Sequence, residues 1–204
     1  AFLDDAPAEE RRTQAIRNRH LFDIEDAAQV AELDPTAIET VRAEAWPDPQ
    51  NADELHDALV LSGFLETGEI RDSLPKWFEF FQQLVLDKRA TALSLASGTV
   101  LWVSAERLSQ LTQCVSAGYS LQPVITPVKT ATEQLEDPES AATQGLVEII
   151  RSRLETLGPV TATALGKPLG IDKRPISRAL LTLETEGFAM RGLFRVNSIS
   201  ACET

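Results

Sequence analysis

The sequence contains little cysteine and no long apolar run, and each shortage excludes a class of protein. Cys114 and Cys202 are the only two cysteines and lie far apart, so they form neither a disulfide framework nor a paired metal-ligand spacing. A reducing, cytoplasmic setting is therefore expected. The apolar runs are much shorter than the roughly 20 residues that a membrane-spanning helix needs, so we expect no membrane partner.

Motifs that carry catalysis are equally scarce. His20 and His56 lack a Cys, Asp or Glu at a recognisable ligand spacing, which favours ordinary surface or core histidines. No glycine-rich phosphate loop is present, so ATP is not expected to bind. Carboxylate pairs are abundant, but none lies in an apolar stretch that would suit acid–base chemistry. We expect no catalytic residue, metal, cofactor or small-molecule substrate in this segment.

Positive charge is scarce overall but unevenly distributed. The net charge of −12 argues against a protein that coats nucleic acid through a general excess of Lys and Arg. Residues 1–144 contain 11 Lys and Arg against 25 Asp and Glu, whereas residues 145–204 contain 8 against 6. The two parts are expected to have different roles.

Residues 1–50 read as an N-terminal helical segment. Proline near the start and acids in the first turn predict a helix over residues 7–19, and Asp34 with Pro35 predicts a second helix that ends near Trp46. The chain starts without an initiator Met or a secretory signal, which indicates a fragment of a longer protein.

Residues 51–114 read as a reduced winged-helix-like module. Asn51 with Glu54 forms an approximate capping box, and Gly63 ends the helix. A helix over 73–86 follows, then a hairpin of strands 91–95 and 100–104, and a helix from Ser104 to about 114. Apolar residues at helical spacing in the 73–86 helix are expected to pack inward: Leu74, Trp77, Phe78, Phe81, Leu84 and Val85.

Residues 115–144 read as a linker or irregular connection, residues 145–196 as a second winged-helix module, and residues 197–204 as a tail. The module consists of an amphipathic helix ending at Gly158, a short helix capped by Thr161, a helix over 172–186 capped by Asp172, and a wing of strands 188–190 and 193–196. The expected fold class is mainly α with short β-hairpins (α+β), with two winged-helix-like modules joined by a linker.

The last helix of a winged helix can lie in the DNA major groove while the wing touches the backbone. With the apolar positions turned inward, four polar residues remain on its outer side, and two arginines lie in the wing. The candidate DNA-binding residues are Lys173, Arg174, Ser177, Arg178, Arg191 and Arg195. The alternative is that the module only mediates protein contacts.

The first module offers less to DNA. The exposed side of its 73–86 helix carries a mixture with little positive charge, so an architectural role is expected. Phe80, Trp46 and Trp102 are aromatic side chains that could contact a neighbouring domain or stack on bases, but core packing is the stronger expectation for each.

Several stretches resemble one family in the same order: Ala-Glu-Ala-Trp-Pro-Asp-Pro at 43–49, Asp-Glu-Leu-His-Asp-Ala-Leu at 53–59, Leu-Trp-Val-Ser-Ala-Glu-Arg-Leu at 101–108, Leu-Val-Glu-Ile-Ile-Arg-Ser-Arg-Leu-Glu-Thr-Leu-Gly-Pro-Val-Thr-Ala at 146–162 and Ala-Leu-Leu-Thr-Leu-Glu-Thr-Glu-Gly-Phe-Ala-Met-Arg-Gly at 179–192. They resemble the C-terminal extension of bacterial large helicase-related (Lhr) proteins. The resemblance implies a parent ATP-dependent DNA helicase of superfamily two that acts in DNA repair, with its motor domains before this segment.

The function expected from sequence is a non-catalytic accessory region that binds DNA, with DNA and the helicase motor domains of the same polypeptide as partners. The alternative is an interdomain or protein–protein scaffold within the helicase. A third hypothesis, part of a DNA glycosylase region, follows from the likeness of the family's extension to winged-helix glycosylases. No glycosylase motif matches a position here, so that activity would need sequence beyond Thr204.

Overall fold

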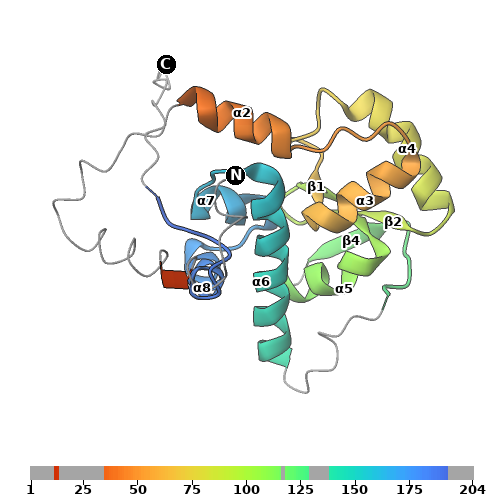
Figure 1. The fold of residues 1–204 in the computed structure, drawn as a ribbon. Coiled ribbons are helices and arrows are strands. Elements are labelled where there is room, and N and C mark those ends of the chain that lie inside the picture. Colours follow the sequence, from red (N-terminus) through yellow and green to blue (C-terminus); the bar gives the residue numbers. More distant parts are fainter. Residues whose placement is uncertain (1–11, 14–34, 116–117, 129–137, 193–204) are drawn as a thin grey trace, which may run out of the picture.

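A computed structural model of the chain describes residues 12–13, 35–115, 118–128 and 138–192, and these form the expected α+β fold (Figure 1). In chain order the elements are α2 (Pro35–Ala45), α3 (Ala52–Ser62), β1 (Leu65–Glu66), α4 (Leu74–Leu86), β2 (Ala90–Leu95), β3 (Val100–Ser104), α5 (Ala105–Cys114), β4 (Tyr119–Gln122), α6 (Pro138–Leu157), α7 (Ala162–Gly166), the 3-10 turn η3 (Lys167–Leu169) and α8 (Lys173–Thr185). The helix expected over 7–19 lies outside the described residues, except that Arg12 and Thr13 are helical.

Predicted caps explain two of the helix starts. Asn51 accepts a hydrogen bond from the Glu54 amide at 2.9 Å, and Thr161 accepts one from the Ala164 amide at 3.2 Å, so both caps are confirmed. The Glu54 carboxylate accepts from the amide of Gln50 at 2.8 Å rather than from that of Asn51, so the capping box is shifted by one residue.

Two other predicted caps hold the expected position without the expected bond. Ser104 precedes α5 and Asp172 precedes α8, but neither side chain makes a capping hydrogen bond. The Ser104 hydroxyl is fully buried and has no hydrogen-bond partner among the described residues. In both cases the cap residue is extended and the apolar face of the helix packs inward. Inward packing therefore stabilises the start of each helix without a side-chain cap.

The hairpin predicted at 91–104 is confirmed and forms the centre of a larger sheet. The four strands are antiparallel in the order β1-β3-β2-β4, with Ala92 opposite Trp102 and Leu93 opposite Leu121. The expected linker at 115–144 therefore needs correction, because it contributes β4 to the sheet and the first turns of α6. Backbone pairing with β2 orders β4, although its own residues are mostly exposed.

An apolar cluster lies on each face of the sheet. α3 and α4 pack on one face, where the buried residues include Leu55, Leu59, Trp77, Phe81, Leu84 and Trp102. α5 and α6 cover the other face, where the buried residues include Leu93, Leu101, Leu108, Leu111, Ile149 and Ile150. Because strand side chains alternate between faces, β3 supplies Trp102 to the first cluster and Leu101 and Val103 to the second.

α6 joins the two parts of the chain. It contacts α2, α3 and α5 along one side and α8 along another, and Figure 1 shows it standing between the sheet and the α7–α8 pair. The cluster that contains Leu101 continues through Ile149 to Ile176 and Leu183 of α8. The proposed first and second modules therefore share one continuous apolar core.

The predicted wing is not confirmed. Residues 188–190, expected to be its first strand, form no strand, and residues 193–196 lie outside the described residues. After α8 the chain turns back on the helix end, where the amides of Phe188 and Ala189 both donate to the carbonyl of Leu183. That capping contact uses the backbone groups a strand would need.

Candidate nucleic-acid interface

The turn that leads into α8 is tightly built. Gly166 ends α7, and a Cβ atom there would clash with the carbonyl oxygen of Ile171 and lie 3.1 Å from the Ile176 side chain. The Ile171 amide donates to the Gly166 carbonyl at 3.1 Å, and Gly170 adopts a left-handed φ of 65°. The lack of a side chain at Gly166 thus allows the start of α8 to pack closely against the end of α7.

α8 has one buried face and one exposed face, as its periodicity predicts. Ile176, Ala179 and Leu183 are buried against α6 and α7, whereas Leu180 is half-buried. The exposed polar residues in its first two turns are the four candidates named from the sequence: Lys173, Arg174, Ser177 and Arg178. The fold brings these four together on one surface.

The start of α8 favours negative charge. The Asp172 side chain makes no capping hydrogen bond, so it does not accept from the backbone amides of the first turn. Pro175 has no N–H, which leaves Lys173 and Arg174 to present backbone amides beside their own cationic side chains. The positive end of the helix dipole adds to that charge.

Several arginines elsewhere in the described chain are paired with acids, although other cations, such as Arg71 and Lys88, form no ion pair among the residues that the structure describes. Arg42 bonds Glu39 at 2.8 Å, Arg89 bonds Asp53 at 2.5 Å, and Arg151 bonds Glu186 at 2.6 Å. By contrast, within the described ranges the side chains of Lys173, Arg174 and Arg178 form no ion pair or hydrogen bond. The start of α8 thus carries three exposed cations without an ion pair in the described chain, beside the exposed carboxylate of Asp172.

The two wing candidates behave differently. The Arg191 side chain is 57% exposed, but one of its guanidinium nitrogens lies 3.6 Å from the carboxylate of Glu184, a buried residue of α8. Arg191 is therefore engaged within the fold. Arg195 lies outside the described residues.

The far end of α8 is anchored to α6. Arg151 bonds Glu186 just beyond the helix and Glu148 at 3.5 Å, and its guanidinium lies 4.8 Å from the centre of the Phe188 ring. Partial burial is the largest single influence on the pKa of Arg151 and lowers it, but bonds to these carboxylates together outweigh burial and raise the pKa. Contacts with Arg151 of α6 therefore anchor the chain at the end of α8, whereas the cations at its start make no such contact within the described residues.

α6 also carries a buried arginine that the sequence patterns do not single out. Arg153 of α6 is 1% exposed, donates to the Phe64 carbonyl at 3.0 Å and pairs with Glu69. Its guanidinium also lies 4.4 Å from the centre of the Phe64 ring. Burial lowers the pKa of Arg153, and Glu69 opposes that shift. Arg153 follows Ile149 by four positions and Ile150 by three, so it lies on the same buried helix face. That spacing is the signal in the sequence from which its burial could have been predicted.

A second polar link has the same architectural role. Arg107 of α5 donates to the Val60 carbonyl at 2.8 Å, to Gln110 at 3.0 Å and to the Ser152 hydroxyl at 3.1 Å. It therefore ties α3, α5 and α6 together. Like Arg153, it is used for internal contacts and is not available to a ligand.

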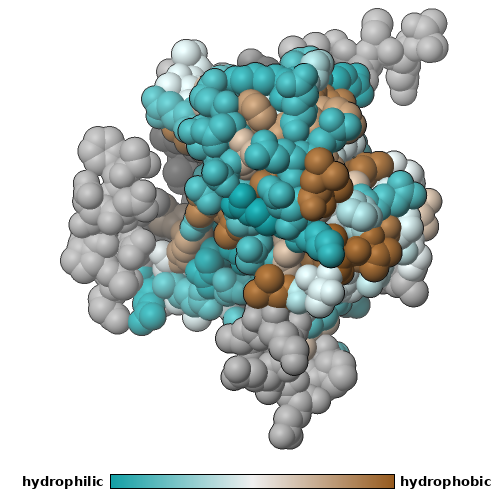
Figure 2. Space-filling model, turned by 90° about the vertical axis from the view of Figure 1, so that its right-hand side faces the viewer, coloured by the Kyte–Doolittle hydropathy of each residue, from teal (hydrophilic) through white to brown (hydrophobic). Residues whose placement is uncertain are grey.

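The aromatic expectations are confirmed for Trp102 and wrong for Phe78. Trp102 is 3% exposed and stacks on Phe81 with ring centres 4.1 Å apart. Phe78, expected to pack inward, is 46% exposed, because α4 covers the sheet along a narrower stripe than its apolar positions span. Phe80 is half-buried against the same core. Figure 2 shows separate hydrophobic spots among hydrophilic residues on the face that includes α4.

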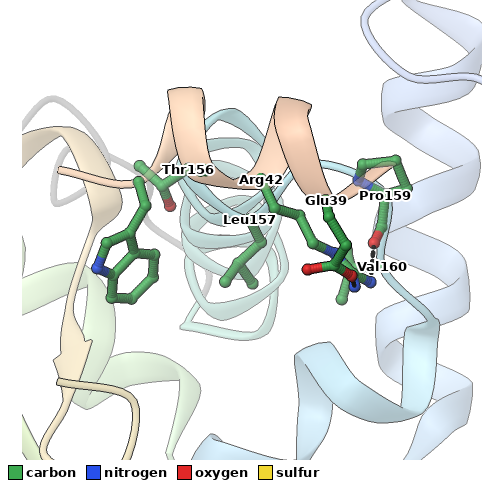
Figure 3. Close-up of a pocket in the computed structure, with 8 residues that line it drawn as sticks. Glu39, Arg42, Thr156, Leu157, Pro159 and Val160 are labelled. Carbon is green, nitrogen blue, oxygen red and sulfur yellow. Dashed lines mark hydrogen bonds and ion pairs between the residues drawn. The ribbon is translucent and has the colours of Figure 1, made fainter. Parts of the chain in front are cut away.

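A pocket of about 570 Å³ lies between α2 and the end of α6. Its lining includes Trp46, Leu157 and Val160, together with Glu39 and Arg42. Figure 3 shows Arg42 reaching across to the Pro159 carbonyl, to which it donates at 2.9 Å. The charged lining side chains are thus committed to internal bonds, and Trp46 is a partly buried wall residue.

His56 and Cys114 both make contacts within the fold. His56 lies 3.2 Å from Glu106, which links α3 to α5. Burial raises the pKa of the Cys114 thiol to about 12. Within the described residues, no group of three or more His, Cys, Asp or Glu is placed to hold a metal ion, and no helix has the length and apolar character needed to cross a membrane.

Comparison with protein-family models finds no match for this chain, and comparison with curated protein sequences finds none either.

Proposed function

We propose that this chain is a non-catalytic, DNA-binding accessory region of a cytoplasmic DNA repair helicase and that it contacts DNA phosphates through the start of α8. The observation that carries the proposal is the group formed by Lys173, Arg174 and Arg178, which is exposed and unpaired within the described residues. Phosphates would supply the ionic partners that these three side chains lack within the described residues.

The arrangement around α8 fits this role. α7, the turn at Gly170 and α8 have the order of a helix-turn-helix, with α6 packed behind them. We propose that α6, α7 and α8 form the helical part of a winged-helix module, with α8 as the helix that enters the groove. The wing contributes no strand before residue 193, so the phosphate contacts proposed here come from the helix.

The helicase assignment depends on the resemblance to the extension of Lhr proteins. Under it, the motor domains of the same polypeptide perform ATP hydrolysis, and this region holds DNA for them. The group of Lys173, Arg174 and Arg178 in a chain of net charge −12 suits such a role. The acidic part would repel DNA and so confine it to these three cations.

The test is binding of the chain to labelled duplex, forked and single-stranded DNA, followed by fluorescence anisotropy. Arg174→Ala and Arg178→Ala should each weaken binding, because each removes a cation close to phosphate. Arg71→Ala is the matched control, since Arg71 is an exposed cation on the turn that precedes α4. Absence of binding even at low salt, or equal weakening in all three variants, would contradict the proposal.

A scaffold function is the second candidate, and exposed apolar side chains favour it. Phe78 is 46% exposed, Leu86 81% and Val124 83%, and all three belong to the acidic part of the chain. If this part docks on the helicase motor, Leu86→Ser should weaken association with the separately produced motor domains and leave DNA binding unchanged.

A further inference from the structure

The exposed face of α8 changes from cationic to apolar along the helix. Beyond Arg178 its exposed residues are Leu181, Thr182 and Thr185, and Leu181 is 42% exposed. The Thr182 hydroxyl donates to the Arg178 carbonyl at 3.3 Å, and the Thr185 hydroxyl donates to the Leu181 carbonyl at 2.8 Å. Those hydroxyl protons are used within the helix, so the second half of the face offers a partner mainly apolar contact.

Leu181 lies on the same stripe as the cations. It follows Arg178 by three positions and Arg174 by seven, and residues at these spacings share one side of an α-helix. Ser177 lies between the arginines, and within the described residues its hydroxyl makes no hydrogen bond. Whatever covers this stripe must therefore present negative charge, a polar group and an apolar group in close succession.

The major groove of duplex DNA presents that combination. Phosphates line its rim, base edges carry hydrogen-bond donors and acceptors, and the C5-methyl group of thymine is the apolar feature on its floor. An acidic peptide would match the charge, but the uncommitted Ser177 hydroxyl at the centre of the stripe favours a surface with exposed polar edges.

We propose that Leu181 contacts thymine methyl groups when α8 lies in the major groove, so that α8 reads base edges as well as phosphates. The inference rests on the proposed function. It makes Leu181 a specificity-determining residue, whereas Arg174 and Arg178 supply affinity that does not depend on sequence.

The test compares two DNA duplexes that differ only in this methyl group. One is the alternating dA-dT copolymer and the other is the alternating dA-dU copolymer of equal length, and both are measured at one low salt concentration. Uracil should weaken binding of the unaltered chain about fourfold, the fold-change that corresponds to about 0.8 kcal/mol for one buried methyl group. Leu181→Ala should bind both copolymers equally. Leu181→Met, which keeps apolar reach, should retain part of the preference, and Leu86→Ala on α4 should retain all of it.

Circular dichroism of each variant establishes that the fold is intact before binding is compared. Equal affinity of the unaltered chain for both duplexes, with binding still sensitive to Arg174→Ala, would overturn the thymine contact and leave the proposed function standing. A preference for A-T that persists in Leu181→Ala would also overturn it, because duplex shape would then be the cause. Failure to bind either duplex would overturn both the thymine contact and the proposed function. Binding of an acidic peptide, with no binding of DNA, would also overturn both.

Discussion

The two parts of the molecule differ in where exposed, unpaired cations gather. In the part before α6, Arg42, Arg89 and Arg107 all make internal bonds, and the surface around them is rich in acids. On α8, Arg174 and Arg178 remain exposed and unpaired within the described residues. Arg71, before α4, is also exposed and unpaired in the described part of the chain but stands alone, so the clustering of unpaired cations, rather than net charge, marks the candidate DNA surface in this acidic chain.

The parts are nevertheless one structure, because α6 packs against both. Arg153 reaches from α6 to Glu69 and to the Phe64 carbonyl near β1, and Arg151 reaches from the same helix to Glu186 beyond α8. Two arginines within one turn of α6 thus hold the sheet on one side and the candidate DNA-binding helix on the other. Three substitutions test how far the two parts depend on each other.

Glu69→Ala should have the largest effect on stability. It would leave the Arg153 guanidinium buried without its carboxylate, which costs about 3 kcal/mol of unfolding free energy. Because Arg153 lies where the parts meet, both should unfold together at lower urea. Circular dichroism with DNA binding as a second readout measures this, and Glu79→Ala, an exposed acid on α4, is the control. A destabilisation as small as that of the control would contradict the link.

Gly166→Ala should act mainly on the second part. The added Cβ would meet the Ile171 carbonyl and the Ile176 side chain, so α8 must shift, at a cost of about 2 kcal/mol. DNA affinity should fall more than global stability predicts. Gly170→Ala is the matched control: it has open space around it and a positive φ, so strain of about 1 kcal/mol is expected without displacement of α8. Equal effects of the two substitutions would show that α8 is not held by this contact.

Glu66→Gln should have the smallest effect, and its sign depends on pH. Burial, and then repulsion by Glu69, raises the pKa of Glu66 in the folded chain. The folded state therefore holds this proton more tightly than the unfolded state, and the stabilisation is lost as pH rises through the folded-state pKa. Glu66→Gln should slightly raise the melting temperature at about pH 7 and change it little at about pH 4. A lower melting temperature at the higher pH would contradict this account.

Local signals in the sequence predict most of the helices and the central hairpin. Asn51 and Thr161 mark helix starts because their side chains bond the first turn, and the continuous apolar run of β3 is typical of a strand buried on both faces. The four polar residues at the start of α8 follow in the same way, since they are what remains when the apolar positions face inward.

Features that depend on tertiary contact are harder to predict. β4 escapes prediction because Tyr119–Gln122 is only four residues long and mostly exposed, and it owes its order to pairing with β2. The burial of Arg153 is unexpected because charge usually indicates exposure, and only Glu69 and Phe64, distant in sequence, make its burial favourable. Phe78 fits the helical period but lies beyond the edge of what α4 covers, which periodicity alone does not reveal.

The central claim is that uncompensated cations on α8 bind DNA phosphates, and the salt dependence of duplex affinity tests it most directly. Each phosphate that a protein neutralises adds about 0.9 to the steepness of log K against log salt. The account predicts that Arg174→Ala combined with Arg178→Ala makes the slope shallower by about twice that amount relative to the unaltered chain. An unchanged slope in the double variant, with the fold intact, would contradict it.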